Sequence, residues 1–161
     1  MSVRTAPVDR GGIAAGRRSD RRALPPPQLF DRLARLAGEV IEAPIALVCL
    51  VHTDRQFFLG AHGLPDHLGV SRETTLEYSI CQHTVATRRP LIVADTRNHP
   101  ALVANRAVRD LGVTAYAGIP LVAADCPVVG AMCVMDYVIR DWTDDQLAFL
   151  AHLADITIEE L

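Results

Sequence analysis

Cys81 is the residue of this sequence best placed for chemistry. Ser79 and Gln82 have the spacing of a capping box, which predicts that a helix begins at Ser79 and puts Cys81 at its second position. Unpaired backbone N–H groups and the helix dipole favour a thiolate at such a position, so Cys81 is a candidate redox residue. Free cysteine is most often a small buried hydrophobe, and that is the role we expect first.

The other residue types that could assist a thiol are poorly spaced. His83 lies two residues from Cys81, and residues two apart face nearly opposite sides of a helix. The cysteines at 49, 126 and 133 and the scattered histidines form no CxxC or HxxxH pattern, so the sequence predicts no zinc or other metal site. GxxxxGK, GxGxxG and GxSxG motifs are absent as well. We therefore expect no catalytic residues and no enzyme activity, with a thiol-based redox sensor or reductase using Cys81 as the alternative.

Four more side chains are candidates for ligand contacts. Asp95 and Asp136 each follow a predicted strand, where a carboxylate can face the mouth of an apolar cavity. Tyr116 lies within a strand, and Tyr78 directly precedes the predicted helix start. An Asp after a strand often caps a turn, and a strand Tyr is usually core, so structural roles compete with this interpretation. With Cys81, these four are the predicted ligand-binding residues.

The elements that must position these residues begin with a helix and a hairpin. Apolar residues recur at helical spacing from Leu29 to Ile41, and Ala43-Pro44 ends the helix. Residues 45–51 form a continuous apolar run typical of a buried strand, and residues 56–61 predict its hairpin partner.

The rest of the chain alternates helices with strands. The pattern predicts a loop at 63–69, a helix from 79 to before Pro90, a strand at 91–94, a helix at 101–111 and strands at 114–122 and 128–135. A second capping box, Thr143 with Gln146, begins a helix that reaches residue 161. Hairpins make neighbouring strands antiparallel, so we predict an α+β fold with one antiparallel sheet and helices on its faces.

Composition indicates one domain with an N-terminal extension. The chain has 161 residues, of which 50% are hydrophobic, enough for one substantial core. Residues 1–28 are rich in Arg and Pro and are expected to be a disordered leader, with the folded domain at 29–161. The net charge is −3, and the Arg-rich leader lacks the aromatic residues and reading motifs of a nucleic-acid binder. No apolar run is long enough to cross a membrane and no secretion signal is evident, so we expect a cytoplasmic protein with reduced thiols.

Four segments in sequence order resemble a bacterial GAF domain. They are SICQH at 79–83, LIVAD at 91–95, YAGIPL at 116–121 and GAMCVMD at 130–136. The resemblance covers about residues 29–161. It implies a central antiparallel sheet with the terminal helices on one face and a ligand cavity on the other. It also implies a sensory module, since GAF domains bind small molecules and several relay a signal through their terminal helices.

The resemblance excludes several known ligand classes of the family but does not identify the ligand of this chain. The cyclic-nucleotide signature of the family includes a lysine, and this chain contains none. Bilin-binding members and methionine sulfoxide reductases use a cysteine in the stretch that corresponds to residues 97–113, and none occurs there. The cofactor is therefore unknown. We expect a non-catalytic module that binds an unidentified small molecule, forms a homodimer through its terminal helices and signals to a partner protein.

Overall fold

A computed structural model describes residues 27–161, and the predicted disordered leader falls almost entirely outside this range. The described chain forms a six-stranded sheet in the order β3-β2-β1-β6-β5-β4, and every neighbouring pair is antiparallel. The predicted α+β class with one antiparallel sheet is confirmed. None of the helices within residues 27–161 is long and apolar enough to span a bilayer.

The strands and helices follow the expected order, with several short additions. The strands are β1 (Ile45–Val51), β2 (Arg55–His62), β3 (Glu73–Thr75), β4 (Leu91–Val93), β5 (Ala115–Val122) and β6 (Val128–Asp136). The helices are α1 (Pro27–Ile41), α2 (Asp66–Ser71), α3 (Cys81–Thr87), α4 (Arg106–Arg109) and α5 (Asp144–Glu160), with 3-10 turns η1 (Leu76–Tyr78) and η2 (Thr96–Asn98).

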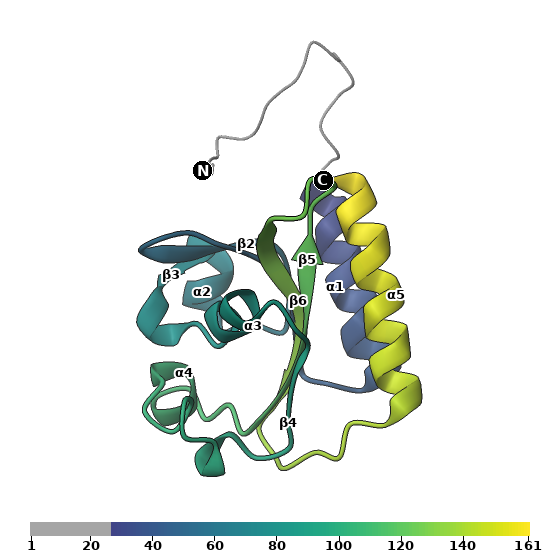
Figure 1. The fold of residues 1–161 in the computed structure, drawn as a ribbon. Coiled ribbons are helices and arrows are strands. Elements are labelled where there is room, and N and C mark those ends of the chain that lie inside the picture. The colour runs from purple at the N-terminus through teal and green to yellow at the C-terminus, as the bar shows by residue number, and fades with distance from the viewer. Residues whose placement is uncertain (1–26) are drawn as a thin grey trace.

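The terminal helices α1 and α5 lie side by side on one face of the sheet (Figure 1). Their inward residues pack against alternate residues of the central strands, among them Val48 of β1 and Val134 of β6. The predicted capping box at Thr143 and Gln146 is present in full and begins α5. Pro27 occupies the first turn of α1, where its missing N–H has no cost, so this helix begins two residues earlier than predicted.

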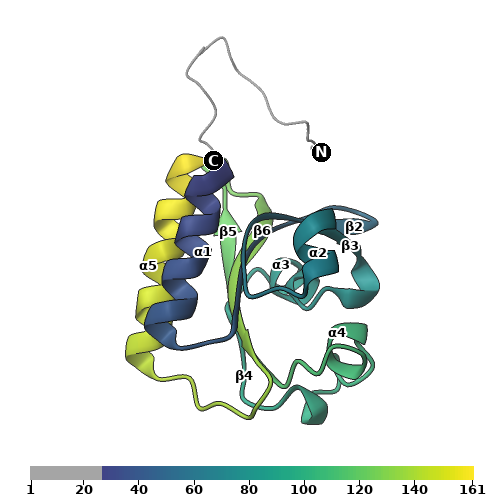
Figure 2. The ribbon, with the colours of Figure 1, turned by 180° about the vertical axis from the view of Figure 1, so that it is seen from behind.

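The short helices α2, α3 and α4 cover the opposite face of the sheet, as the view from behind also shows (Figure 2). A second apolar core lies beneath them and contains Leu47 of β1, Cys133 of β6 and Tyr116 of β5. The sheet thus separates two cores, and each central strand contributes alternate side chains to both.

Three local predictions on this second face were wrong. The predicted loop at 63–69 runs into α2, and the unpredicted β3 follows it; both elements are too short to leave a periodic signal. The predicted helix at 101–111 is reduced to α4, because Asn105 caps a helix there by accepting a hydrogen bond from the Ala107 amide. Cys81 is the first residue of α3 rather than the second residue of a helix starting at Ser79.

Candidate functional site

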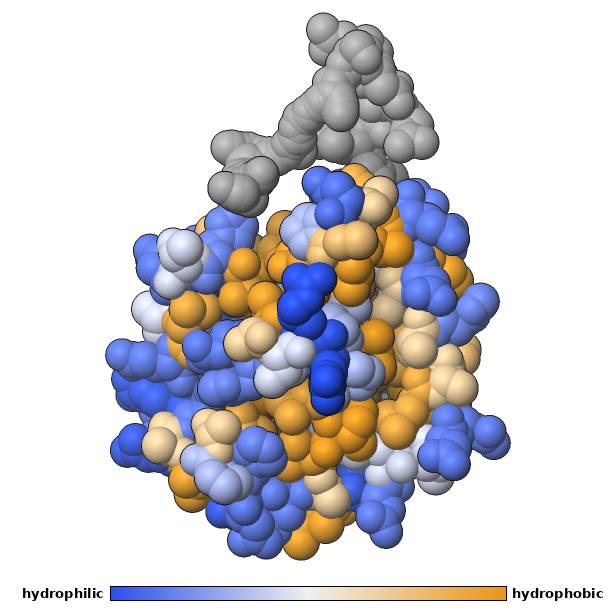
Figure 3. Space-filling model, viewed as in Figure 1, coloured by the Kyte–Doolittle hydropathy of each residue, from blue (hydrophilic) through white to orange (hydrophobic). Residues whose placement is uncertain are grey.

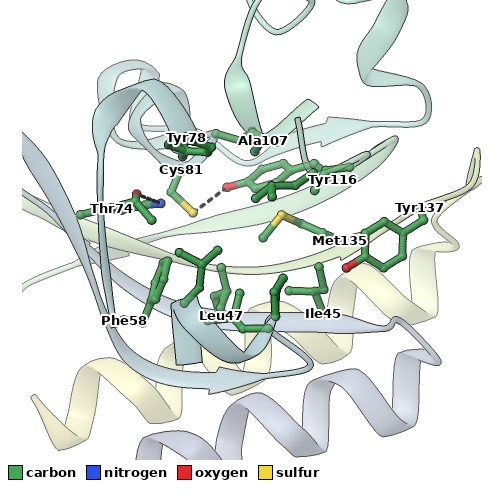
Figure 4. A pocket seen from close by; sticks show the side chains of 17 residues that line it. Ile45, Leu47, Phe58, Thr74, Tyr78, Cys81, Ala107, Tyr116, Met135 and Tyr137 are labelled. Carbon is green, nitrogen blue, oxygen red and sulfur yellow. Dashed lines mark hydrogen bonds between the residues drawn. The ribbon is translucent and has the colours of Figure 1, made fainter. Parts of the chain in front are cut away.

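A narrow cavity lies between the sheet and the short helices (Figure 4). Its free volume is about 40 Å³, room for a few water molecules. Phe58, Leu47 and Ile45 lie on one side of it, and Tyr78 and Ala107 on the other. The remaining lining residues are Gln56, Leu64, Pro65, Leu68, Thr74, Ile80, Cys81, Leu111, Val113, Tyr116, Met135 and Tyr137.

Gln56 places an unpartnered polar atom at this cavity. Its side chain is 4% exposed, and its amide nitrogen donates a hydrogen bond of 2.9 Å to Thr74 Oγ1. Its carbonyl oxygen Oε1 is the one buried side-chain N or O atom without a hydrogen-bond partner among residues 27–161. Because an unmade hydrogen bond at a buried acceptor costs about 1–3 kcal/mol, Oε1 is the atom most in need of a donor.

The Tyr116 side chain lies within the second core. Its hydroxyl lies 2.9 Å from Thr84 Oγ1 and donates to Cys81 Sγ over 3.3 Å, the contact drawn as a dashed line in Figure 4. Its ring lies over Gly118, where an added Cβ would approach the Tyr116 oxygen to 2.2 Å. Glycine at 118 therefore leaves the space that this hydroxyl occupies. Burial raises the pKa of Tyr116 well above its ordinary value, so the phenol stays neutral.

Cys81 belongs to a cluster of three buried thiols. Cys81 Sγ lies 3.6 Å from Cys49 Sγ and 3.6 Å from Cys133 Sγ. All three side chains are at most 2% exposed, whereas Cys126 is exposed. Contacts with the Cys133 and Cys49 thiols, together with the hydrogen bond from the Tyr116 hydroxyl, lower the pKa of Cys81, while the pKa values of Cys49 and Cys133 are raised. Cys81 is thus the sulfur in contact with both other thiols, and we call Cys49, Cys81 and Cys133 the thiol trio.

The two predicted carboxylate contacts lie outside the cavity. Asp95 caps η2 and forms a two-pronged ion pair with Arg97, which lowers the pKa of Asp95. Asp136 binds Arg140 at 2.8 Å and accepts a hydrogen bond from the Tyr137 amide. Both carboxylates therefore have structural partners, and the prediction that they contact the ligand finds no support. The structure brings Tyr78, Cys81 and Tyr116 together at the cavity.

A second, open depression of about 430 Å³ lies between η1 and α4. It is lined by polar residues that include His83, Asn105 and Arg106. Arg106 is already engaged there, since it pairs with Asp110 at 2.7 Å and stacks on the Tyr78 ring. Because this depression is open and its Arg106 is already paired, it is a weaker candidate than the cavity beside Gln56.

The family model described as GAF domain matches residues 25–158. The chain belongs to the GAF domain family. The solved GAF domain of an Acinetobacter phosphoenolpyruvate-protein phosphotransferase has a similar fold, with a TM-score of 0.68 at 12% identity over 83% of this chain and 80% of that one. A free methionine-R-sulfoxide reductase of Neisseria meningitidis, solved with its substrate, gives a TM-score of 0.65 at 15% identity over 83% of this chain and 76% of that one.

Among curated proteins, this GAF domain is similar to a cyclic di-GMP phosphodiesterase of Pseudomonas aeruginosa. The two are 26% identical over 136 residues, which are 83% of this chain and 22% of the relative. The chain therefore spans about a fifth of the length of the curated relative that it matches. The solved structures show the fold, and the family match identifies the chain as a GAF domain, a ligand-binding signalling domain. The choice of ligand depends on the residues described above.

Sequence reasoning missed three functional candidates of this GAF domain. Alternate residues of β2 face inward, and Gln56 takes one of these positions. A polar residue two positions before the inward-facing Phe58 was the signal by which the sequence could have revealed Gln56. Cys49 and Cys133 lie within continuous apolar strands, where no alternation tells which face a side chain takes. Only the register of β1 with β6 brings these two thiols together.

Proposed function

We propose that this domain is a non-catalytic sensory module that binds a small, uncharged ligand in the enclosed cavity. The unpartnered Gln56 Oε1 is the observation that supports the proposal, because it offers a ligand N–H or O–H a hydrogen bond that no described residue makes. Among the residues that the structure describes, no Asp, Glu, Lys, Arg or His lines the cavity. A charged ligand would lose its hydration there without gaining an ion pair, so the lining favours a neutral one.

The cover over the cavity is suited to opening. Leu64 and Pro65 contribute to the lining from the segment that leads into α2, and Leu68 contributes from α2 itself, a helix that has no buried residue. Because few apolar contacts hold α2 down, its displacement costs little free energy. A ligand larger than the present 40 Å³ would enter by moving this cover rather than the sheet.

The central strands connect the cavity to the terminal helices. In β1, Ile45 and Leu47 line the cavity, whereas the alternating residues Ala46 and Val48 pack in the core shared with α1 and α5. A ligand that shifts β1 therefore moves residues on both faces, since strands in a packed core move as units. We propose that a signalling partner, in the same chain or another, reads the position of the helices.

Paired probes test the proposed ligand chemistry. Indole and phenol carry a donor, and 1-methylindole and anisole are their donor-free counterparts. We expect the donor-bearing probes to bind about 5- to 10-fold more tightly, as one hydrogen bond of about 1 kcal/mol implies. In Gln56→Leu this preference should vanish, with stability unchanged or raised, because no buried acceptor is left unpaired. Probe titration followed by NMR measures the affinities.

Asp95→Asn is the matched control, since Asp95 lies outside the cavity and should leave both affinities unchanged. An equal preference for donor-bearing probes in the native protein and in Gln56→Leu would refute the role of Gln56. Failure of all four probes to bind the native protein would refute the cavity as a site for neutral ligands of this class.

We also propose a homodimer through the terminal helices. Leu36 and Val40 are 43% and 54% exposed, lie one turn apart on α1 and face away from the sheet. Hydrophobic residues also lie along the side formed by α5, among hydrophilic ones (Figure 3). We expect Leu36→Glu to shift sedimentation from dimer to monomer, because a charge buried in a symmetric interface would face its own copy. A native protein that sediments as a monomer would contradict the proposal.

A thiol-based redox sensor or reductase using Cys81 is the second candidate function. Its support is the contact of Cys81 with two further thiols. The burial of all three weighs against rapid reaction with an external oxidant, since reactive thiols are normally accessible. A non-catalytic sensor is the proposal that fits the cavity best, and we propose separately that it works in the cytoplasm.

A further inference from the structure

The thiol trio joins three elements that are distant in sequence. Cys49 comes from β1, Cys133 from β6 and Cys81 from the first turn of α3. Leu47 pairs with Cys133 and Cys49 pairs with Ala131, so the two strand cysteines are diagonal neighbours on the same sheet face. The short helix α3 packs over them and supplies the third sulfur.

The spacing of the sulfur atoms fits a shared metal ion. All three lie within 4.8 Å of one another, and two of the separations are 3.6 Å. With metal–thiolate bonds of about 2.3 Å, the sulfur atoms of a three-coordinate site lie roughly 3.8–4.0 Å apart, depending on how flat it is. For the two separations of 3.6 Å, a sulfur movement of a few tenths of an ångström closes the difference, and rotation of the side chains is enough to supply it.

The surroundings select the kind of ion. Thiolates favour soft ions, of which Cu(I) and Zn²⁺ are the common ones. Zn²⁺ in structural sites is almost always tetrahedral and requires a fourth ligand. The nearest candidate is the Tyr116 hydroxyl, which is neutral and engaged with Thr84 and Cys81. Cu(I) is stable with two or three sulfur ligands, so the three thiols alone complete its shell.

We propose that Cys49, Cys81 and Cys133 form a binding site for a single Cu(I) ion. Binding forms copper–sulfur bonds and releases thiol protons to solvent, with no change in oxidation state. If one thiol keeps its proton, two thiolates and Cu(I) leave one net negative charge. The Tyr116 hydroxyl, which donates to Cys81, is placed to stabilise that charge.

The position of Cys81 determines how copper would reach the site and which elements its binding would hold together. Cys81 lines the cavity, so an ion delivered there meets this sulfur first, while Cys49 and Cys133 lie behind it. Bound copper would fasten α3 to β1 and β6, the two central strands that also pack against the terminal helices. Copper binding would therefore influence the positions of α1 and α5, the same helices that a ligand in the cavity would influence.

Copper transfer under anaerobic conditions tests the site. The full chain, fully reduced, is titrated with the Cu(I) complex of bicinchoninate, and the loss of its colour reports transfer to the protein. We expect one equivalent of Cu(I) per chain, and X-ray absorption at the copper edge should show only sulfur neighbours, three at about 2.3 Å. Cys49→Ala and Cys133→Ala should each reduce transfer at least 10-fold, whereas Cys126→Ala, the exposed control, should match the native protein.

Several results would overturn the assignment. These are no transfer to the native protein, a copper shell that contains nitrogen or oxygen, or transfer that is lost in Cys126→Ala. Retention of Zn²⁺ in a four-ligand shell would overturn the choice of Cu(I). The absorption measurement on native protein keeps the test valid even where a buried Cys→Ala variant fails to fold. The neutral-probe titrations are separate, so either proposal can fail without the other.

Discussion

Gly130→Ala is expected to lower the free energy of unfolding by about 3 kcal/mol or more. A Cβ at this position would lie 1.8 Å from the backbone oxygen of Cys49 and 2.9 Å from its carbonyl carbon. Both atoms belong to β1, which pairs with β6 at the centre of the sheet, so neither can move aside without separating the two strands. Overpacking against backbone is costlier than the usual 1–3 kcal/mol for side chains that can rearrange.

Gly69→Ala is the matched control for this substitution. Gly69 lies within α2, and a Cβ there would meet no atom within 4 Å. Alanine favours the helix over glycine, so we expect stabilisation of about 0.5–1 kcal/mol. Urea denaturation of the three proteins measures both effects. Equal stability of Gly130→Ala and the native domain would show that the close pairing of β1 with β6 is not needed for folding.

The fold was largely predictable because its main elements are long and strongly patterned. The stripe of α1, the apolar run of β1 and the Thr143–Gln146 capping box each follow from local sequence, and the structure confirms them. The elements over the cavity were predicted poorly, because α2 and α4 have six and four residues. Helices this short are formed by caps and tertiary contacts rather than by periodicity.

The site was predictable only in part, because it depends on contacts between distant residues. Cys81, Tyr78 and Tyr116 could be selected by type and position, and they do line the cavity. Grouping Cys81 with Cys49 and Cys133 requires knowledge of strand register and of where α3 docks. A metal site was rejected from sequence because spacing motifs detect only ligands that lie near one another along the chain.

Arg140 connects the sheet to the C-terminal end of α1, and its loss should be nearly as damaging as overpacking the sheet. Its Nη1 donates to Asp136 at the end of β6 and to the Glu42 carbonyl, and its Nη2 donates to the Ile41 carbonyl. Those carbonyls belong to the C-terminal end of α1, where unpaired acceptors and the helix dipole favour a positive charge. The guanidinium also stacks 4.4 Å from the centre of the Trp142 ring.

Arg140→Met is expected to lower the free energy of unfolding by about 2–4 kcal/mol. The loss is large because the Arg140 and Asp136 side chains are 17% and 13% exposed, and methionine leaves the carboxylate without its cation. Arg140→Lys should recover only part of it, since a single ammonium cannot reach all three acceptors in the same geometry. Urea denaturation of these variants, alone and combined with Asp136→Leu, measures the coupling energy, which we expect to be about 1–3 kcal/mol.

The same variants separate the two roles considered for Asp136. As a structural partner of Arg140, Asp136 should leave the affinity of indole unchanged when it is replaced, while stability falls. As a ligand contact, it would change affinity with little coupling to Arg140. If the effects of Arg140→Met and Asp136→Leu on stability are additive and the Asp136→Leu variant binds the probes more weakly, Asp136 contacts the ligand. Strong coupling with unaltered binding would identify Arg140 as the residue that joins β6 to the end of α1 and to Trp142, which directly precedes the N-cap of α5.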